Sequence, residues 1–478
     1  MHRRVDAVIL GSALGGLVAA AYLCRQGRRV AVLEHAPRVG GRLGGSPVRE
    51  GYWVDFGHRE GHDVGDCQFA WYYGAQAAAE LDVDIPLRKI DRPLRVHRVD
   101  AGVVREGDWA GSGFFALAEE ILGCPRASVA GLASLFSRAA RATPEEVASA
   151  IGETLPSWLE RNERDPAVRQ AALRFVAVVF HRHPETASAG RWMQFFRIPK
   201  AGPFVAAHPR YGGMQGLVEP WAEAVRTSGG EIFLGWKPVR ILLERGRVRG
   251  ALAVDEANLV LEVEAPVVVV AYPVWEVFSL VAAESFPAAW VERARALTRY
   301  RSELAAWVAG LRRLPRIRAE DRPEDFPGWN RLLRGEGRDY FGGFQITSLS
   351  SPACAPPGRH LLVLATVRWP ELGANGLLPW EDAKHELDEA RGYLSRFYVD
   401  FEDCIEWSSY QYVESPQVTG WYWAPVERHS VEVPGVEGLF FAGSTVEAPA
   451  GIVDLAAYSG REAARKAQEF LSRLPAEG

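Results

Sequence analysis

The sequence predicts an α/β protein of two interleaved domains, one built on a parallel sheet and the other of mixed α+β structure. Three observations lead to this class. The first fifty residues read as strand, glycine-rich turn, helix and strand; short strands return between residues 231 and 271; and a strand near residue 440 runs into a helix. We therefore assign residues 1–100, 207–280 and 426–478 to the parallel-sheet domain, and residues 101–206 and 281–425 to the second domain.

The N-terminal unit begins with a buried strand at Val5–Leu10, and the turn Gly11–Gly16 follows it. A helix is expected over Leu17–Gln26 and a second strand over Arg29–Leu33, with Glu34 at the end of that strand. An acid 23 residues after the first glycine, in this order of elements, is typical of a Rossmann-type dinucleotide-binding unit.

Each position of this glycine turn has a physical role. Gly11 permits the tight turn, and Gly16 lets the helix pack closely on the strand. The helix N-terminus offers free N–H groups to a diphosphate, and Glu34 can accept hydrogen bonds from ribose hydroxyls. Ala13 replaces the middle glycine of the pattern, so its methyl group predicts a shifted diphosphate contact. The cofactor contacts predicted in this unit are Gly11, Ser12, Ala13, Gly15, Gly16 and Glu34.

A second motif, Gly40-Gly41-Arg42, follows the acid after a short interval. With the unit before it, this motif resembles the flavin-containing amine oxidase and phytoene desaturase superfamily. The resemblance implies FAD as the cofactor and places Gly41 and Arg42 near the FAD phosphates. The segment Trp53–His58 (WVDFGH) resembles the next segment of that superfamily, which brings backbone close to the isoalloxazine ring.

The centre of the chain resembles the same superfamily. A turn rich in glycine at residues 209–214 precedes a helix expected over Gly216–Thr227, which Gly229-Gly230 ends. Short strands are then expected at Glu231–Leu234, Val239–Leu243, Val248–Val254, Leu259–Val263 and Val267–Ala271. In the superfamily a valine at this point holds the adenine through its backbone, and Val239 is the matching position.

The C-terminal block resembles the second FAD signature of the superfamily. A strand at residues 438–442 runs into Gly443-Ser444, and a helix is expected from Asp454 to Ala467. The resemblance implies that this helix end faces the flavin and stabilises negative charge on the reduced ring. Ser444 stands where many relatives have an Asp for the ribityl chain. The matching cofactor residues are Gly443, Ser444, Ile452 and Val453.

Three residues are candidates for the chemistry itself. Since a flavin accepts the hydride, the protein needs only to hold the substrate and exclude water. Trp421 and Trp423, just before the second signature, are candidate walls of the pocket, although a core strand explains them equally well. His58 lies in the segment expected near the flavin and is a candidate proton acceptor.

Composition excludes several other classes. The net charge of −5 gives no positive field for nucleic acid. Five scattered cysteines predict neither a disulfide framework nor a zinc site, and they indicate a cytoplasmic protein. His181 and His183 do not share a helix face, so we expect no metal. Apolar runs such as Pro266–Tyr272 are too short to cross a bilayer, and a peripheral membrane contact stays open.

Together these features predict an FAD-dependent oxidoreductase that takes a hydride from a lipophilic small molecule, as desaturases do. The rich aromatic content, with 16 Trp, favours an apolar ligand. Two alternatives remain at this stage. One is an amine oxidase that releases peroxide, with Trp421 and Trp423 flanking the flavin. The other is a non-catalytic escort protein on the same fold, which resembles the Rab GDP-dissociation inhibitors.

Overall fold

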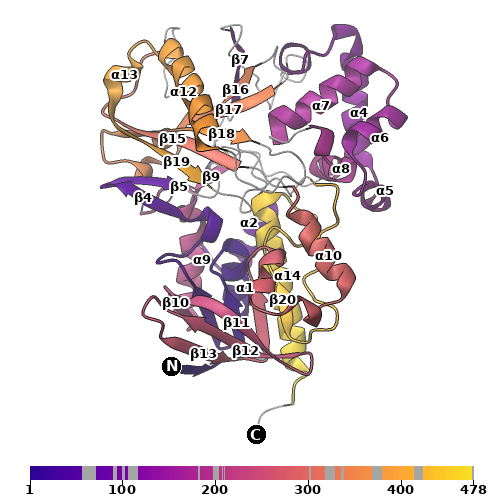
Figure 1. Ribbon diagram of the computed structural model, residues 1–478, viewed down its shortest axis with the longest axis vertical. Helices are drawn as coiled ribbons and strands as arrows, with labels where there is room; N and C mark the ends of the chain where they lie inside the picture. Colours follow the sequence, from indigo (N-terminus) through magenta and orange to yellow (C-terminus); the bar gives the residue numbers. More distant parts are fainter. Residues whose placement is uncertain are drawn as a thin grey trace.

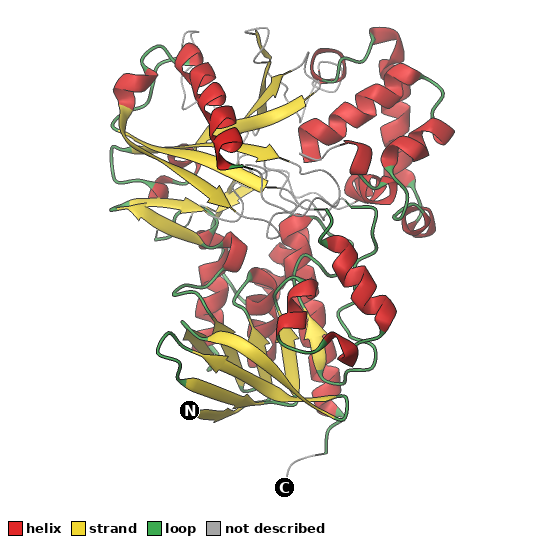
Figure 2. Cartoon of the chain, in the orientation of Figure 1, coloured by secondary structure: helices red, strands yellow, loops and turns green. Residues whose placement is uncertain are grey.

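A computed structural model describes residues 1–55, 71–89, 94–98, 103–105, 117–180, 184–197, 204–206, 208, 210–300, 303–317, 329–334, 339–368, 379–413 and 424–475. Within these residues the chain forms three parts (Figure 1). A lobe with both termini, which we call the parallel-sheet lobe, lies at one end. A sheet lobe and a helical lobe lie side by side at the other end (Figures 1 and 2).

The parallel-sheet lobe is organised around a five-stranded parallel sheet in the order β10-β3-β2-β14-β20. Its central strands are buried on both faces, as a parallel sheet covered by helices requires. Every residue of β2 and of β14 is less than 1% exposed. The strands are β2 (Ala7–Leu10), β3 (Val30–Glu34), β10 (Glu231–Leu234), β14 (Val267–Val270) and β20 (Leu439–Phe441).

Three helices run alongside this sheet: α1 (Leu14–Arg25), α9 (Gln215–Thr227) and α14 (Ile452–Ser472). Ten of the twelve residues of α1 are buried, because it is apolar on nearly all sides. It begins at Leu14, three residues before the predicted start. Gly15 and Gly16 therefore belong to its first turn, where a Cβ would meet the backbone of Gly443 and of Gly11, respectively.

A four-stranded sheet in the order β1-β13-β12-β11 covers the end of this lobe. Its strands are β1 (His2–Arg4), β11 (Lys237–Glu244), β12 (Arg247–Val254) and β13 (Val260–Glu264). The predicted turn between β11 and β12 is present, and Arg245 and Gly246 both have positive φ, 51° and 78°. Such a pair of angles matches the twist of a tight hairpin.

The sheet lobe contains a seven-stranded sheet in the order β19-β15-β18-β17-β16-β7-β8. One face packs on α12 (Trp380–Phe397), whose Leu387 and Leu394 are fully buried as their spacing predicts. β7 lies within the first predicted segment of the FAD domain, yet it pairs with β16 in this sheet. The strands are β7 (Leu94–Arg98), β8 (Val103–Arg105), β15 (Glu303–Leu311), β16 (Trp329–Arg334), β17 (Asp339–Ile346), β18 (His360–Arg368) and β19 (Ile405–Val413).

Among the described residues, five α-helices between β8 and β9 (Phe204–Ala206) form the helical lobe. A capping box starts α5, in which Thr143 accepts from the Glu146 N–H and Glu146 accepts from the Thr143 N–H. The helices are α4 (Val129–Arg141), α5 (Pro144–Ser149), α6 (Leu155–Asn162), α7 (Pro166–Phe180) and α8 (Ala189–Arg197).

The remaining elements are short connections and edge pieces. Two small sheets pair β4 (Gly45–Arg49) with β5 (Tyr52–Asp55) and β6 (Leu87–Lys89) with β9. The other helices are α2 (Tyr72–Glu80), α10 (Ala288–Leu297), α11 (Thr347–Ser350) and α13 (Phe401–Cys404).

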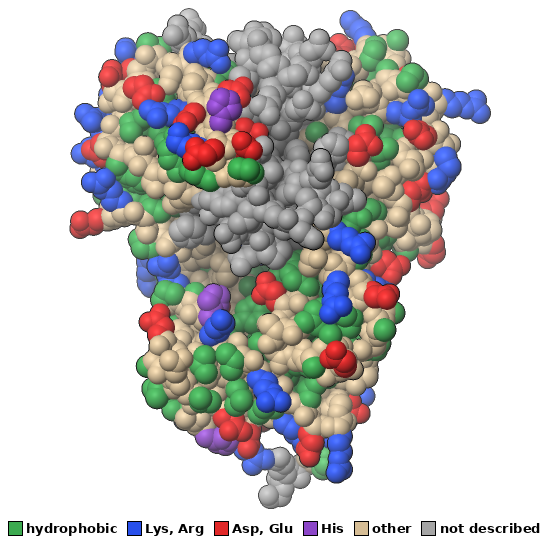
Figure 3. Space-filling view, in the orientation of Figure 1, with side chains coloured by type: hydrophobic (Ala, Val, Ile, Leu, Met, Phe, Trp, Pro, Cys, Tyr) green, Lys and Arg blue, Asp and Glu red, His purple; other side chains and the backbone are tan. Residues whose placement is uncertain are grey.

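The predicted α/β class, with a Rossmann-type domain and a mixed second domain, is confirmed. No helix among the described residues combines the length and apolar character needed to cross a membrane. On the face shown in Figure 3, basic and acidic side chains are interspersed over the described surface.

Candidate functional site

The glycine turn between β2 and α1 has the geometry that its sequence predicts. Gly11 has φ +93°, and its N–H donates to the Leu33 carbonyl at 2.8 Å. A Cβ at Gly11 would lie 2.9 Å from the ring of Tyr272, and a Cβ at Gly16 would clash with the Gly11 carbonyl oxygen. Only glycine fits either position, so the backbone itself forms this surface.

Glu34 holds this turn together from the end of β3. Its Oε2 accepts from the N–H and the hydroxyl of Ser12, at 2.8 and 2.6 Å. Its Oε1 accepts from the Ala36 N–H at 2.8 Å and pairs with His35 Nδ1 at 2.9 Å. Burial alone would raise the pKa of Glu34, but the hydrogen bonds from His35, Ser12 and Ala36 lower it, so the buried carboxylate is charged.

These four donors fill the acceptor sites of the Glu34 carboxylate. Two of them belong to Ser12 in the turn and one is the backbone N–H of Ala36, whereas the His35 side chain is 63% exposed and the Glu34 side chain only 2%. A ribose hydroxyl can therefore reach the carboxylate by taking the place of His35. The ribose contact of Glu34 stays a prediction, and the structure adds a second role for Glu34 in shaping the turn.

The start of α1 is free to receive an anion. Its N-cap, Ala13, makes no side-chain hydrogen bond to the helix, and the first turn carries no acid. A Cβ at Gly41 would lie 3.1 Å from the methyl carbon of Ala13, so this methyl group lies against the Gly40-Gly41 turn. The Gly40 N–H donates to the Ser12 carbonyl at 3.0 Å. The two motifs thus form one surface at the positive end of a helix, as a diphosphate requires.

The C-terminal motif meets this surface directly. The Arg42 guanidinium donates to the Ser444 hydroxyl at 2.6 Å, which joins residues 402 positions apart. Gly443 has φ +121°, and a Cβ at Gly15 would lie 2.8 Å from the Gly443 nitrogen. Head and tail of the chain therefore build a single site. Ser444 engages Arg42 in place of the charged residue that many relatives have.

The helix α14 also presents a free N-terminus. Gly451 is its N-cap and makes no side-chain hydrogen bond. Helical residues begin at Ile452, and Val453 is buried. The acid of the first turn, Asp454, points elsewhere, because it accepts from the N–H groups of Tyr73 and Gly74 at 3.0 and 2.6 Å. We call residues 443–451, between β20 and α14, the flavin loop.

Asp454 is fully buried, and its pKa is raised to about 6. Burial is the main cause, and the backbone hydrogen bonds from Gly74, Tyr73 and Tyr72 act against it. Asp454 therefore caps α2 at neutral pH but lies close to its titration range.

Val239 lies at the edge of the parallel-sheet lobe with 38% of its surface exposed, so it is not a core residue. The register of β11 on β12 shifts between Pro238 and Arg240, and Val239 has no partner residue in β12. Such a bulge leaves backbone groups available for another partner. Since the Trp236 N–H donates to the Glu34 carbonyl at 2.9 Å, the segment is tied to the end of β3. Adenine binding by Val239 stays a prediction.

Two residues of the site were not found from the sequence. Gln215, at the start of α9, accepts from the Gly45 N–H at 3.1 Å and donates to the Val39 carbonyl at 3.2 Å, so it holds both ends of the loop that carries Arg42. Tyr272, just after β14, packs its ring on Gly11. Only the position of Gln215 directly after the Gly-Gly-Met turn could have indicated its role.

The three residues proposed for the chemistry, His58, Trp421 and Trp423, lie outside the described residues. The face of the seven-stranded sheet opposite α12 is described. Gln411, Ala306, Ala365 and Gly343 pair in one row across four of its strands. Ala306 and Ala365 belong to the hydrophobic cluster that spans the parallel-sheet lobe and the helical lobe, and not to the cluster under α12. The Gln411 Oε1 is buried and has no hydrogen-bond partner within the part of the chain that the structure describes.

Comparison with known proteins agrees with this geometry. The family model described as flavin containing amine oxidoreductase matches residues 14–467. A search of curated protein sequences found no match.

Solved structures share the fold at low sequence identity. An oxidoreductase from Methanosarcina mazei is 18% identical, with a TM-score of 0.66 over 97% of this chain and 99% of that one. Putrescine oxidase bound to putrescine is 17% identical, with a TM-score of 0.62 over 99% and 100%. Cyclohexylamine oxidase from Brevibacterium oxydans is 17% identical, with a TM-score of 0.59 over 98% and 100%.

The residues present fit FAD: two uncapped helix ends, a cradle at Gly11 and Gly16 that a Cβ would fill, and Arg42 beside the flavin loop. The bound flavin supplies a hydride acceptor. The predicted cofactor and the predicted enzyme class are thus confirmed, and the escort protein is not. The chain belongs to the flavin-containing amine oxidoreductase family and is an FAD-dependent oxidoreductase.

Proposed function

We propose that this oxidoreductase removes a hydride from a lipophilic small molecule held between the flavin and the sheet face opposite α12. The character of that face carries the proposal. From β19 to β17 its central row consists of Gln411, Ala306, Ala365 and Gly343, none of which is charged, and Arg331 continues the row in β16. A charged substrate placed over these four positions would lose its hydration without a charged partner among them, whereas an apolar substrate loses nothing.

Oxidation of an amine is the second candidate. The structural neighbours include oxidases named for putrescine and for cyclohexylamine. In this chain the Gln411 Oε1, which has no hydrogen-bond partner among the described residues, is the acceptor that we propose for one substrate N–H. An apolar amine suits both the uncharged row of the sheet face and the single acceptor at Gln411. A diamine with two charges suits neither as well.

Anaerobic mixing of the holoenzyme with three kinds of compound separates these candidates. The probes are an apolar compound without nitrogen, such as a linear polyene; the apolar amine cyclohexylamine; and the polar diamine putrescine. Bleaching of the flavin by the polyene supports the desaturase-like reaction, and bleaching by cyclohexylamine with peroxide on readmission of oxygen supports an apolar amine.

Reduction by putrescine alone would overturn the lipophilic proposal in both forms. Failure of all three probes, in a protein whose flavin is still bleached by dithionite, would also reject it, because the flavin is then competent and the substrate class is wrong.

A further inference from the structure

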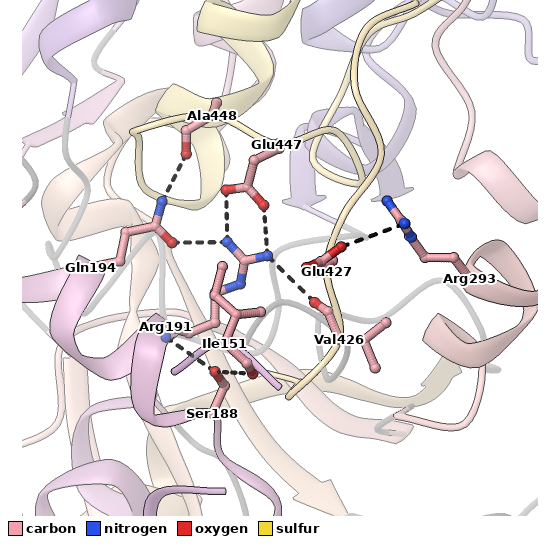
Figure 4. Close-up of polar contacts among 9 residues, drawn as sticks. All are labelled: Ile151, Ser188, Arg191, Gln194, Arg293, Val426, Glu427, Glu447 and Ala448. Carbon is pink, nitrogen blue, oxygen red and sulfur yellow. Dashed lines mark hydrogen bonds and ion pairs between the residues drawn. The ribbon is translucent and has the colours of Figure 1, made fainter. Parts of the chain in front are cut away.

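We propose that Arg191 and Gln194 of the helical lobe are positioning residues for the flavin, because they hold the flavin loop from outside the FAD-binding domain. The observation is a buried arginine that reaches from α8 to Glu447 (Figure 4). No motif of the sequence indicates this contact. It joins residues 256 positions apart and links the helical lobe to the second FAD signature.

The contact is a two-point ion pair. Arg191 Nη1 and Nη2 donate to the two carboxylate oxygens of Glu447, each at 2.7 Å. The Arg191 side chain is 1% exposed. Burial alone would raise the pKa of Glu447, but the hydrogen bond from Arg191 and the charges of Arg428 and Arg191 lower it to about 2. The pair is therefore ionised at any working pH, and its fork geometry fixes direction as well as distance.

Two neighbours extend this contact along the chain. Gln194 accepts from Arg191 Nη1 at 3.0 Å, and its Nε2 donates to the Ala448 carbonyl at 2.9 Å. Arg191 Nη2 also donates to the Val426 carbonyl at 3.4 Å. One turn of α8 thus grips two consecutive residues of the flavin loop and the segment that leads to β20.

The α8 end of this contact is rigid. The Ser188 hydroxyl accepts from the Arg191 N–H at 3.1 Å and donates to the Ile151 carbonyl at 2.7 Å. A Cβ at Gly190 would clash with the Val147 carbonyl, so α8 lies directly on the backbone of α5. The arginine therefore extends from a fixed base.

The flavin loop depends on such an anchor. Before Glu447 it is held by the parallel-sheet lobe: Ser444 accepts from Arg42, and the Thr445 hydroxyl accepts from the Val274 N–H at 3.2 Å. At Glu447 the backbone N–H donates to the His429 carbonyl at 2.7 Å. The side chain of Glu447 and the carbonyl of Ala448 are held from α8, just before the loop turns into the N-terminus of α14. The helical lobe thereby helps to fix the position of the N-terminus of α14, the helix end expected to face the flavin.

The test compares variants of the full-length protein for FAD affinity and for the flavin midpoint potential, neither of which needs a substrate. We expect Arg191→Met to raise the Kd of FAD at least tenfold and to shift the potential, because the loop loses its direction. Arg191→Lys should give an intermediate Kd, since an ammonium replaces the fork with a point charge. The matched control is Arg138→Met, which removes a 2.9 Å ion pair with Glu163 elsewhere in the helical lobe. Its FAD Kd should stay within twofold.

The double variant Arg191→Met/Glu447→Leu separates positioning from stability. Replacement of both partners by apolar residues generally restores the stability that removal of one partner costs. We expect the double variant to melt near the wild type without FAD and still to bind FAD weakly. Recovery of stability, FAD affinity and potential together would overturn the proposal. Should Arg191→Met not fold, wild-type FAD affinity and potential in Glu447→Gln would overturn it equally. Failure of the substrate proposal would leave all these readouts unchanged.

Discussion

At the scale of single residues, Glu34, a predicted cofactor ligand, also has a structural role in the glycine turn. Glu34 was predicted as a ribose ligand from its spacing and from the order of the elements around it, and its carboxylate also accepts from Ser12 and Ala36. The sequence could not reveal this, because the hydroxyl of Ser12 reaches Glu34 only after β2 and β3 pair. Removal of Glu34 therefore changes the turn as well as the ligand contact.

A substitution that keeps the shape of Glu34 separates the two roles. In Glu34→Gln the amide NH2 must face either Ser12 or Ala36, both of which are donors, so we expect a loss of about 1 to 3 kcal/mol in stability. We also expect FAD to raise the melting temperature by less than it does in the wild type, because the ribose contact is weaker. Both temperatures come from thermal melts with and without FAD.

His35→Ala is the control for this experiment, since it removes the exposed partner of Glu34 and leaves the turn intact. Its FAD affinity should stay within twofold of the wild type. An unchanged FAD-dependent increment in Glu34→Gln would show that the carboxylate does not contact the cofactor.

Asp454 gives a pH dependence whose sign is set by its raised pKa. Below its ordinary pKa of 3.8 the folded and unfolded chains both carry the proton. Between pH 4 and about 6 the unfolded chain releases the proton first, so stability falls as the pH rises, by on the order of 3 kcal/mol. Above pH 6 the loss is constant. Asp454→Asn lacks this titration, so in thermal melts at saturating FAD its stability relative to the wild type should improve from pH 4 to about pH 6 and level off above that pH.

Asp400→Asn is the matched control for Asp454. The pKa of Asp400 is lowered to about 2, because hydrogen bonds from Arg316 and Arg313 outweigh the effect of burial, which alone would raise it. The stability that the ionised Asp400 contributes is lost only as the pH falls below 4. The difference in stability between Asp400→Asn and the wild type should therefore be constant from pH 4 to pH 7. A constant difference for Asp454→Asn as well would mean that Asp454 does not titrate there.

At the scale of elements, the close packing of α1 on α14 links the two cofactor motifs. A Cβ at Gly460 would clash with the Gly15 carbonyl and lie 3.0 Å from the Val18 Cβ. Gly15 itself lies in the first turn of α1, beside Gly443. Two helix backbones approach this closely only where side chains are absent.

Gly460→Ala should therefore separate the helices, at a cost of about 1 to 3 kcal/mol in stability and with a weaker affinity for FAD. Gly392→Ala, in the middle of α12, is the matched control. A Cβ there meets nothing within 4 Å, so we expect a gain of roughly 0.5 to 1 kcal/mol and unchanged FAD binding. Thermal melts and FAD titrations check both, and an equal effect of the two substitutions would contradict the packing argument.

Local patterns explain which elements the sequence could predict. β10 agrees with its predicted bounds, because the turn signal Gly229-Gly230 directly precedes it. α14 starts two residues before its predicted start and continues to Ser472, because apolar positions recur along its whole length. β1 was not predicted, since its three residues are exposed and polar and it exists only through its pairing with β13.

At the scale of the whole molecule, the arrangement depends on contacts between distant segments, which explains what the sequence left open. The pairing of β7 with β16 joins segments more than two hundred residues apart, and no local pattern specifies it. The same holds for Arg191 and Glu447. The cofactor motifs were found because each is local, whereas their convergence was inferred from a resemblance and is shown by contacts such as Arg42 to Ser444.

A shared cofactor site predicts a distributed response to FAD. In hydrogen exchange, addition of FAD to the apo-protein should protect backbone amides in three separate segments at once: residues 11–16, the bulge of β11 around Val239, and the flavin loop with the first turn of α14. Each segment supplies backbone groups that a dinucleotide would cover, and the helix ends of α1 and α14 carry N–H groups without side-chain caps. The amides of α12, on the far face of the seven-stranded sheet, should exchange at the same rate with and without FAD. Protection of the first segment without the last would contradict a site shared by both ends of the chain, because the flavin ring would then lie away from α14.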